Sequence, residues 1–217
     1  MFNQSLVTPM TALKFSSRKF VSVDSSKCTG CGICEYACAL EKENNVNPLY
    51  SRIRVVRMIP VFNFALSCRF CEDAKCVTAC PEKALFQLEQ TGIIMVEEKK
   101  CKGCDWCVQA CPHGGITIYS DGHARIAVTC DLCDGEPKCV EFCPEEALEL
   151  VGTDEEAEIR FNKALKELPA EIERLSDTIK NKDWKPLLAK AEEISLRVSE
   201  KLESLNKKAT AKNSNVP

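Results

Sequence analysis

The sixteen cysteines of this 217-residue chain form four runs of four, and no cysteine lies outside them. The first and third runs have the spacing C-x2-C-x2-C-x3-C, whereas the second and fourth widen the middle gap to four and five residues. Four thiolates are the ligand set of a cubane 4Fe–4S cluster. The sequence therefore predicts four such clusters, with no ligand missing or left over. The runs are Cys28/Cys31/Cys34/Cys38, Cys68/Cys71/Cys76/Cys80, Cys101/Cys104/Cys107/Cys111 and Cys130/Cys133/Cys139/Cys143.

Disulfides and structural zinc are the two other uses of so many cysteines. A disulfide framework needs an oxidising compartment, and the first twenty residues contain no uninterrupted apolar run that would predict a signal peptide. Zinc sites usually bring together two C-x2-C pairs from separate segments, often with histidine. Here a third cysteine follows in the same loop, and proline follows the last cysteine of three runs, at Pro81, Pro112 and Pro144. This pattern favours iron–sulfur clusters.

The spacing within a run also predicts local geometry. Three cysteines on one tight loop can hold three corners of a cube, and the fourth, at the start of a short helix that leads away, faces a different cube. Cys38 is followed by ALEKENN and not by proline, so the helix of the first run is expected to continue. Gly30, Gly32 and Gly103 lie inside these loops, where the backbone must approach the cluster closely and φ can be positive.

Composition excludes several other functions. No apolar stretch of eighteen residues is present, so we expect no membrane span. Acidic residues outnumber basic ones, 32 to 29, which argues against nucleic-acid binding. No glycine-rich nucleotide motif occurs, and His113 and His123 are best interpreted as solvated or packing residues. We expect a cytoplasmic protein that is not itself an enzyme.

Residues 1–19 form an N-terminal arm, and residues 20–151 form the cluster domain, with an extended insertion at 39–67. Three repeats after the fourth cysteine, CPEKALFQL, CPHGGITIY and CPEEALELV, predict short helical turns followed by apolar strands. The T-G and S-D-G turn signals in ALFQLEQTGIIMVEEKKC and ITIYSDGHARIAVTC predict two β-hairpins. The expected class is α+β, with two pseudo-symmetric dicluster ferredoxin-like modules built from short β-hairpins and helices. Arg52 and Arg54 share one face of the inserted strand, either as a solvated face or as a docking strip for an acidic partner.

After Val151 the chain becomes rich in Glu, Lys, Leu and Ala. Apolar residues recur at steps of three and four over 152–207, which predicts a C-terminal helical hairpin with a break near 181–186. Pro169 is expected to kink or restart the first helix. The apolar stripes must be covered by each other, by the cluster domain or by another protein. Residues 208–217 are expected to form a disordered tail.

The four runs, in this order and spacing, resemble the four-cluster iron–sulfur subunits of molybdenum and tungsten oxidoreductases, formate dehydrogenase, hydrogenase and carbon monoxide dehydrogenase systems. The segments CEDAKCVTACPEKAL and CDLCDGEPKCVEFCPEEAL carry the similarity most clearly. The segment CALEKENNVNPLYSRIRVV is similar to small members that accompany carbon monoxide dehydrogenase or tungsten aldehyde oxidoreductases. The resemblance covers about residues 20–151 and leaves the helical extension unmatched.

This resemblance implies that run one pairs with run four and run two with run three, giving four ligand sets. The first set is Cys28, Cys31, Cys34 and Cys143, and the second is Cys130, Cys133, Cys139 and Cys38. The third set is Cys68, Cys71, Cys76 and Cys111, and the fourth is Cys101, Cys104, Cys107 and Cys80.

The expected function is electron transfer. The chain would pass single electrons between a catalytic oxidoreductase subunit and a second redox protein, as part of a hetero-oligomer in an anaerobe. A free polyferredoxin that serves several enzymes is the main alternative, and an iron–sulfur sensor or a structural cluster protein is another.

Overall fold

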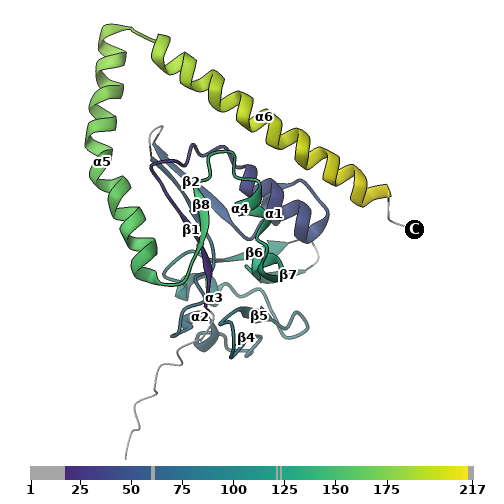
Figure 1. Ribbon diagram of the computed structural model, residues 1–217. Helices are drawn as coiled ribbons and strands as arrows, with labels where there is room; N and C mark the ends of the chain where they lie inside the picture. The colour runs from purple at the N-terminus through teal and green to yellow at the C-terminus, as the bar shows by residue number, and fades with distance from the viewer. Residues whose placement is uncertain (1–17, 60–61, 121, 123, 215–217) are drawn as a thin grey trace, which may run out of the picture.

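The computed structural model describes residues 18–59, 62–120, 122 and 124–214. Most of the predicted N-terminal arm, as well as His123, lies outside these residues. Four two-stranded antiparallel sheets and several short helices form one body, and two long helices lie along its outside (Figure 1). The sheets are β1 (Phe20–Val23) with β8 (Leu148–Val151), β2 (Arg54–Ile59) with β3 (Phe62–Leu66), β4 (Leu85–Gln87) with β5 (Ile94–Val96), and β6 (Ile116–Ser120) with β7 (Arg125–Thr129). The expected α+β class with small β-hairpins is confirmed.

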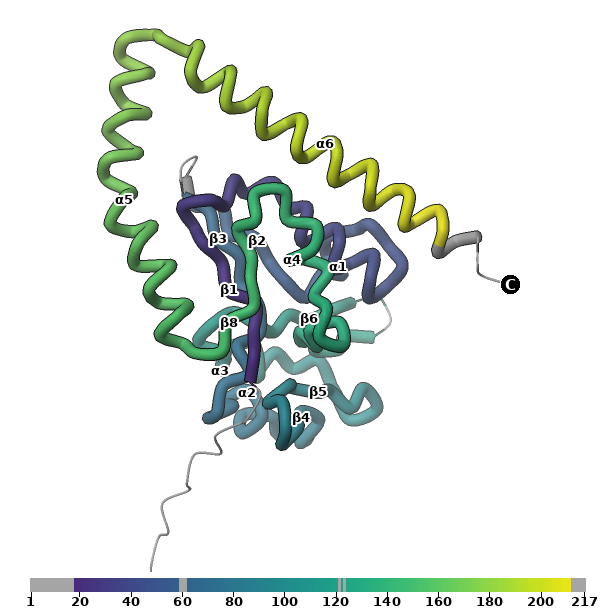
Figure 2. Tube along the Cα trace, viewed as in Figure 1, coloured from purple at the N-terminus to yellow at the C-terminus, as the bar shows by residue number. Residues whose placement is uncertain are grey.

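The sheet formed by β1 and β8 joins the two ends of the cysteine-rich region. Phe20 is opposite Val151 and Val23 is opposite Leu148 in an antiparallel register (Figure 2). These are also the outer residues of the predicted 20–151 domain, whose limits stay a prediction. Because β1 precedes the first cysteine run and β8 follows the last, their pairing brings run one close to run four.

Each cysteine run carries one short helix. These are α1 (Ile33–Glu43), α2 (Lys75–Thr78), α3 (Trp106–Ala110) and α4 (Lys138–Glu141). The helices α2, α3 and α4 each begin one residue before the third cysteine of their run and end before the fourth, so the prediction of a helix that starts at the fourth cysteine is wrong for these runs. The cause is the proline that follows, because a residue before proline avoids the helical conformation. Run one has no such proline, and α1 continues through Cys38 as expected.

The insertion after α1 contains a 3-10 turn, η1 (Pro48–Tyr50), and then the hairpin of β2 and β3. A second 3-10 segment, η2 (Leu132–Gly135), follows Cys130 in run four. The cysteines themselves form part of the core. The main buried cluster combines Phe20, Phe70 and Ile94 with side chains of all four runs. Bound metal clusters would therefore lie at the centre of the domain.

The C-terminal extension is a helical pair, α5 (Asp154–Asn181) and α6 (Lys185–Ser214). The two helices diverge from their connection: α5 packs on β1 and β8, and α6 packs on α1 (Figure 1). Thr153 caps α5 by accepting a hydrogen bond from the Glu156 amide at 3.2 Å. The expected pair is present, but its helices do not cover each other: Ala157, Ala164 and Leu205 are buried, whereas apolar side chains such as Ile159 and Leu188 stay exposed.

Two details of the extension differ from expectation. α5 runs through Pro169 without interruption, because one missing hydrogen bond is tolerated in a helix of 28 residues that is also held by packing. α6 continues to Ser214, so residues 208–214 are helical and the prediction of a disordered tail is wrong for them. The segment KATAK consists mainly of alanine and lysine, which have high helix propensity.

Candidate cluster-binding site

The first ligand set meets in one cavity. Cys28, Cys31 and Cys34 line it from run one, and Cys143 lines it from run four. The pairing of β1 with β8 is what brings these distant segments together. The structure thus places side by side the four cysteines that the resemblance groups together.

The third ligand set also shares a cavity. Cys68, Cys71 and Cys76 from run two line it together with Cys111 from run three. Ile94 and Ile116 supply apolar walls. Two of the four implied sets are therefore each arranged around a single enclosed space.

In the other two sets, the proximity of the cysteines is indicated by their effects on one another's pKa and by the packing of α2 against α3. Cys38 and Cys133 both lie close enough to Cys130 to contribute to the increase in its pKa. In the fourth set, Cys101 and Cys104 contribute in the same way to the pKa of Cys107. Cys80 follows α2, which packs against the Cys107 helix α3.

Burial makes these thiols poor acids until a cation binds. Loss of solvent is the main cause that raises the pKa of Cys28 and of Cys76 to about 11, and that of Cys130 to about 12. Neighbouring cysteines raise these values further. Since iron binds the thiolate, such a site is stable only when the metal compensates the buried negative charge. The sets of sulfur donors around these cavities fit 4Fe–4S clusters.

Backbone amides repeat at the same position after the fourth cysteine. The amides of Ala84, Gly115 and Ala147 each donate a hydrogen bond, at 3.3 Å, to the sulfur of the cysteine four residues earlier. In run one this position lies within α1, and the amide of Arg52 instead donates to Cys38 Sγ at 3.2 Å. Hydrogen bonds to sulfur tune the redox potential of a cluster. The repeated CP-x-x-A/G pattern was a visible sequence signal for them, but it was not interpreted in this way.

The predicted glycines occupy the expected backbone conformations. Gly30, Gly32 and Gly103 have φ angles of 73°, 82° and 60°. Gly103 is also tightly packed, since an added Cβ would lie 2.5 Å from the carbonyl oxygen of Arg125. Only glycine combines this conformation with such a close approach.

A charged network lies beside the second set. Asp131 follows Cys130 and forms ion pairs with Lys42 at 2.6 Å and with Arg52 at 3.3 Å. Burial is the largest single influence and opposes ionisation of Asp131, but the hydrogen bonds from Lys42 and the Cys133 amide, together with the charges of Lys42 and Arg52, lower the pKa of this carboxyl group. Sequence analysis missed Lys42 and Asp131, because the network joins segments about ninety residues apart.

Arg52 and Arg54, which form the predicted strip, bind other groups of the same domain. Besides Asp131, Arg52 pairs with Glu43 at 3.3 Å. Arg54 donates to the carbonyl oxygens of Pro48 and Leu49 at 2.7 and 2.8 Å. Both guanidinium groups therefore make contacts within the domain instead of forming a freely solvated face, and the docking strip stays a prediction.

The ligand sets follow one another through the domain. Cys34 of the first set lies near enough to Cys139 of the second set to raise its pKa, and Cys130 of the second set does the same to Cys68 of the third. The third and fourth sets are joined by α2 and α3, which pack together. The ligand sets that the resemblance implies would therefore form a series, with the first set at one end and the fourth at the other.

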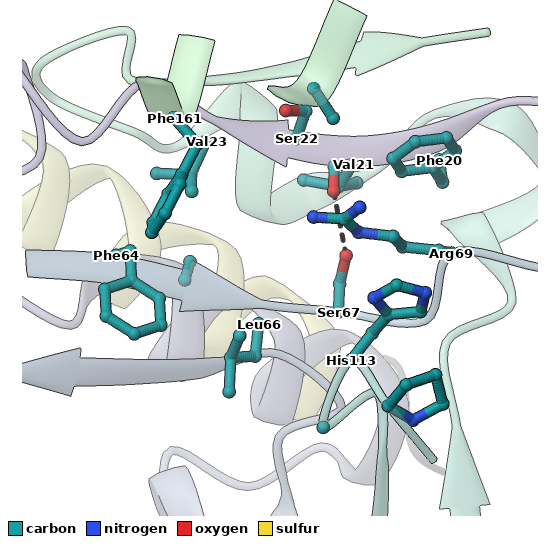
Figure 3. A pocket seen from close by; sticks show the side chains of 14 residues that line it. Phe20, Val21, Ser22, Val23, Phe64, Leu66, Ser67, Arg69, His113 and Phe161 are labelled. Atoms are coloured by element: carbon teal, nitrogen blue, oxygen red, sulfur yellow. Dashed lines mark hydrogen bonds between the residues drawn. The ribbon is translucent and has the colours of Figure 1, made fainter. Parts of the chain in front are cut away.

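His113 lines the cavity of the third ligand set and also a second cavity of about 310 Å³ between β1, β3 and α5 (Figure 3). Burial and the nearby charge of Arg69 lower the pKa of His113, which favours its neutral form. Phe20, Phe64 and Phe161 also line the cavity, and Ser67 donates a hydrogen bond to the Val21 carbonyl oxygen at 2.9 Å. This setting agrees with the interpretation of His113 as a packing residue.

Comparison with known proteins assigns the cysteine-rich region. The family model described as "4Fe-4S dicluster domain" matches residues 59–153, and that described as "4Fe-4S binding domain" matches residues 20–45. Both matches end before α5. No helix in the described residues is long and apolar enough to cross a bilayer.

Two curated relatives carry the resemblance along most of their length. The polyferredoxin-like subunit of aliphatic sulfonate oxidoreductase from Pyrococcus furiosus is 43% identical over 137 residues, which are 62% of this chain and 78% of the relative. The thiosulfate reductase electron transfer subunit PhsB from Salmonella typhi is 34% identical over 148 residues, which are 61% of this chain and 74% of the relative. A solved structure of the active site complex BamBC of benzoyl coenzyme A reductase aligns at 25% identity and a TM-score of 0.37, covering 75% of this chain and 96% of that chain. We conclude that the chain belongs to the family of ferredoxin-type electron-transfer subunits and carries four 4Fe–4S clusters.

Proposed function

We propose that this chain is the electron-transfer subunit of an oxidoreductase complex and conducts single electrons between a catalytic subunit and a second redox protein. What supports the proposal is the serial order that the four implied ligand sets would have, from the first set beside α6 to the fourth set at the opposite end. A single site would suffice for sensing, whereas a series connects two separate places on the surface.

The protein supplies the cluster ligands, excludes water from the clusters and adjusts their redox potentials. A bound 4Fe–4S cluster supplies one-electron storage with little change in structure. Four cysteines would hold each cluster, and the buried side chains around them exclude water. Amides such as those of Ala84, Gly115 and Ala147 donate to the sulfurs and favour the more negative, reduced state. No residue is required to exchange a proton or to bind a substrate.

The identity of the partners is part of the proposal. The relatives from Pyrococcus furiosus and Salmonella typhi are named as subunits of a sulfonate oxidoreductase and a thiosulfate reductase, which supports a catalytic partner for this chain. A molybdenum or tungsten enzyme, a carbon monoxide dehydrogenase or a hydrogenase is the class that the sequence predicts. The second redox protein and the cytoplasmic location also stay predictions.

A free polyferredoxin is the second candidate. Part of the apolar surface of the helical pair lies against the cluster domain: Leu205 of α6 is 4% exposed and packs with Ile33, Ala37 and Phe142, although Leu188 and Leu196 of the same helix are exposed. The extension is thus partly an internal cover, and it does not by itself require a permanent partner.

Anaerobic purification of the native protein separates the two candidates. We expect about sixteen iron atoms per chain, in a complex with a larger subunit that contains molybdenum, tungsten or another catalytic metal centre. The same iron content on a lone chain would contradict the subunit assignment and support the mobile carrier. Zinc in place of iron would overturn both.

A further inference from the structure

The fourth ligand set reaches the surface. All sixteen cysteines lie in the described residues, and Cys104 is the one that is exposed; the others are buried or partly buried. Electron tunnelling weakens steeply with distance, so a cluster with an exposed ligand is the natural place for exchange with another protein. The fourth set is also the end of the series.

The same loop presents an unusually exposed aromatic side chain. Trp106 stands two residues after Cys104, and 60% of its surface is exposed. Tryptophan is enriched among the residues that dominate binding energy at protein interfaces. Phe86 and Met95, cross-strand neighbours in β4 and β5 of this part of the molecule, are exposed as well.

The charges around Cys104 are only partly balanced. Lys100 pairs with Glu97 at 2.6 Å, and Asp105 pairs with Arg125 at 2.7 Å. Lys99 and Lys102 are exposed and form no ion pair within the described part of the chain, and Glu98 is the one remaining carboxylate of this segment. Lys99 and Lys102, opposed by the single carboxylate of Glu98, therefore give the surface around Cys104 a net positive charge.

The opposite end of the series is less accessible. α6 runs over α1 (Figure 1), and Cys31 of the first set lies at the edge of the apolar cluster that Leu205 forms with Phe142. Bidentate hydrogen bonds of 2.8 Å from Arg197 to Glu145 hold α6 in place. The helices α2 and α3 and the β4–β5 hairpin lie at the far end from α6 (Figure 1).

We propose that Lys99, Lys102, Cys104 and Trp106 form the docking surface for the second redox protein, and that this partner is acidic, with an apolar recess for the indole ring surrounded by carboxylates. The inference deepens the proposed function and rests on it. Complementary charge would orient the partner and speed its encounter, and the buried indole would supply affinity. In each transfer the reduced fourth cluster loses one electron and the partner's cofactor gains it.

Stopped-flow reoxidation of the reduced, cluster-loaded chain tests this surface, with an acidic flavodoxin as the probe. Its flavin accepts one electron and takes one proton from solvent. We expect the second-order rate constant to fall about tenfold between low salt and 0.5 M salt. It should fall about tenfold in W106A and in the double variant K99E/K102E at low salt. Matched controls on the helical pair, W184A and K166E/K207E, should react like wild type.

The outcomes are distinguishable because iron content and the electrons taken up from dithionite are measured before mixing. A wild-type chain that takes up no electrons would contradict the proposed function itself. Loaded variants that reduce flavodoxin as fast as wild type, or controls that are slowed equally, would overturn only the docking surface. A wild-type rate that does not depend on salt would rule out the acidic partner. If W106A fails to retain iron, the rate constant of K99E/K102E alone tests the docking surface.

Discussion

Gly115 and Cys68 approach each other so closely that no side chain fits between them. A Cβ added to Gly115 would lie 2.6 Å from the Cα of Cys68, and the Gly115 amide donates to Cys111 Sγ at 3.3 Å. This contact joins the two segments that supply the third ligand set. Because the obstacle is backbone, it cannot move aside as a flexible side chain could.

The variant G115A should therefore lose the third cluster. The added methyl group would push the Cys68 loop away from Cys111 and separate the cysteines that line this cavity. Iron analysis and low-temperature EPR of the reduced protein should show about four iron atoms fewer per chain.

Gly152 offers the matched control, since a Cβ there would meet only the Arg18 carbonyl oxygen at an ordinary 3.8 Å. G152A should keep all of its iron. Full cluster content in G115A would show that the third set does not depend on this close approach.

The packing of α6 depends on Leu205, which is 4% exposed, whereas Leu196 on the same helix is 67% exposed. Truncation of a buried leucine to alanine typically costs about 2 kcal/mol or more. We expect L205A to increase amide hydrogen exchange in α6 by about thirtyfold, since this helix would open more often. L196A should leave exchange near the wild-type rate. Equal exchange in both variants would mean that α6 is held by its ion pairs alone.

Lys42 places a positive charge beside the second set through its ion pair with Asp131. A nearby cation favours the reduced cluster, because reduction adds negative charge. Replacement of this charge in K42M should lower the potential of one cluster by an amount on the order of tens of mV. An EPR-monitored redox titration measures the shift, with K42R as the charge-preserving control. An unchanged potential in K42M, or the same shift in K42R, would contradict an electrostatic role.

Local features of the fold followed from the sequence. The cysteine spacing predicted the cluster loops, and turn residues between alternating strands predicted the hairpins β4–β5 and β6–β7. The absence of proline after Cys38 correctly predicted a longer α1. Each of these signals lies within one short segment, so the neighbouring residues are enough to predict the local structure.

Long-range relationships did not follow in the same way. The pairing of β1 with β8 and the bond from Arg197 to Glu145 join segments that only the complete fold brings together. The apolar stripe of α6 indicated that something must cover it, but amphipathic periodicity carries no information about the covering surface. The grouping of cysteines from different runs likewise came from family resemblance and not from spacing.

The most direct test of the account compares two cysteines that are far apart in the sequence and line one cavity, Cys34 and Cys143. EPR spectra of the reduced variants C34S and C143S should show the loss or alteration of the same single cluster, with the other three unchanged. Such a result would support the first ligand set and the pairing of run one with run four. Changes in two different clusters, or four undisturbed clusters in either variant, would contradict it.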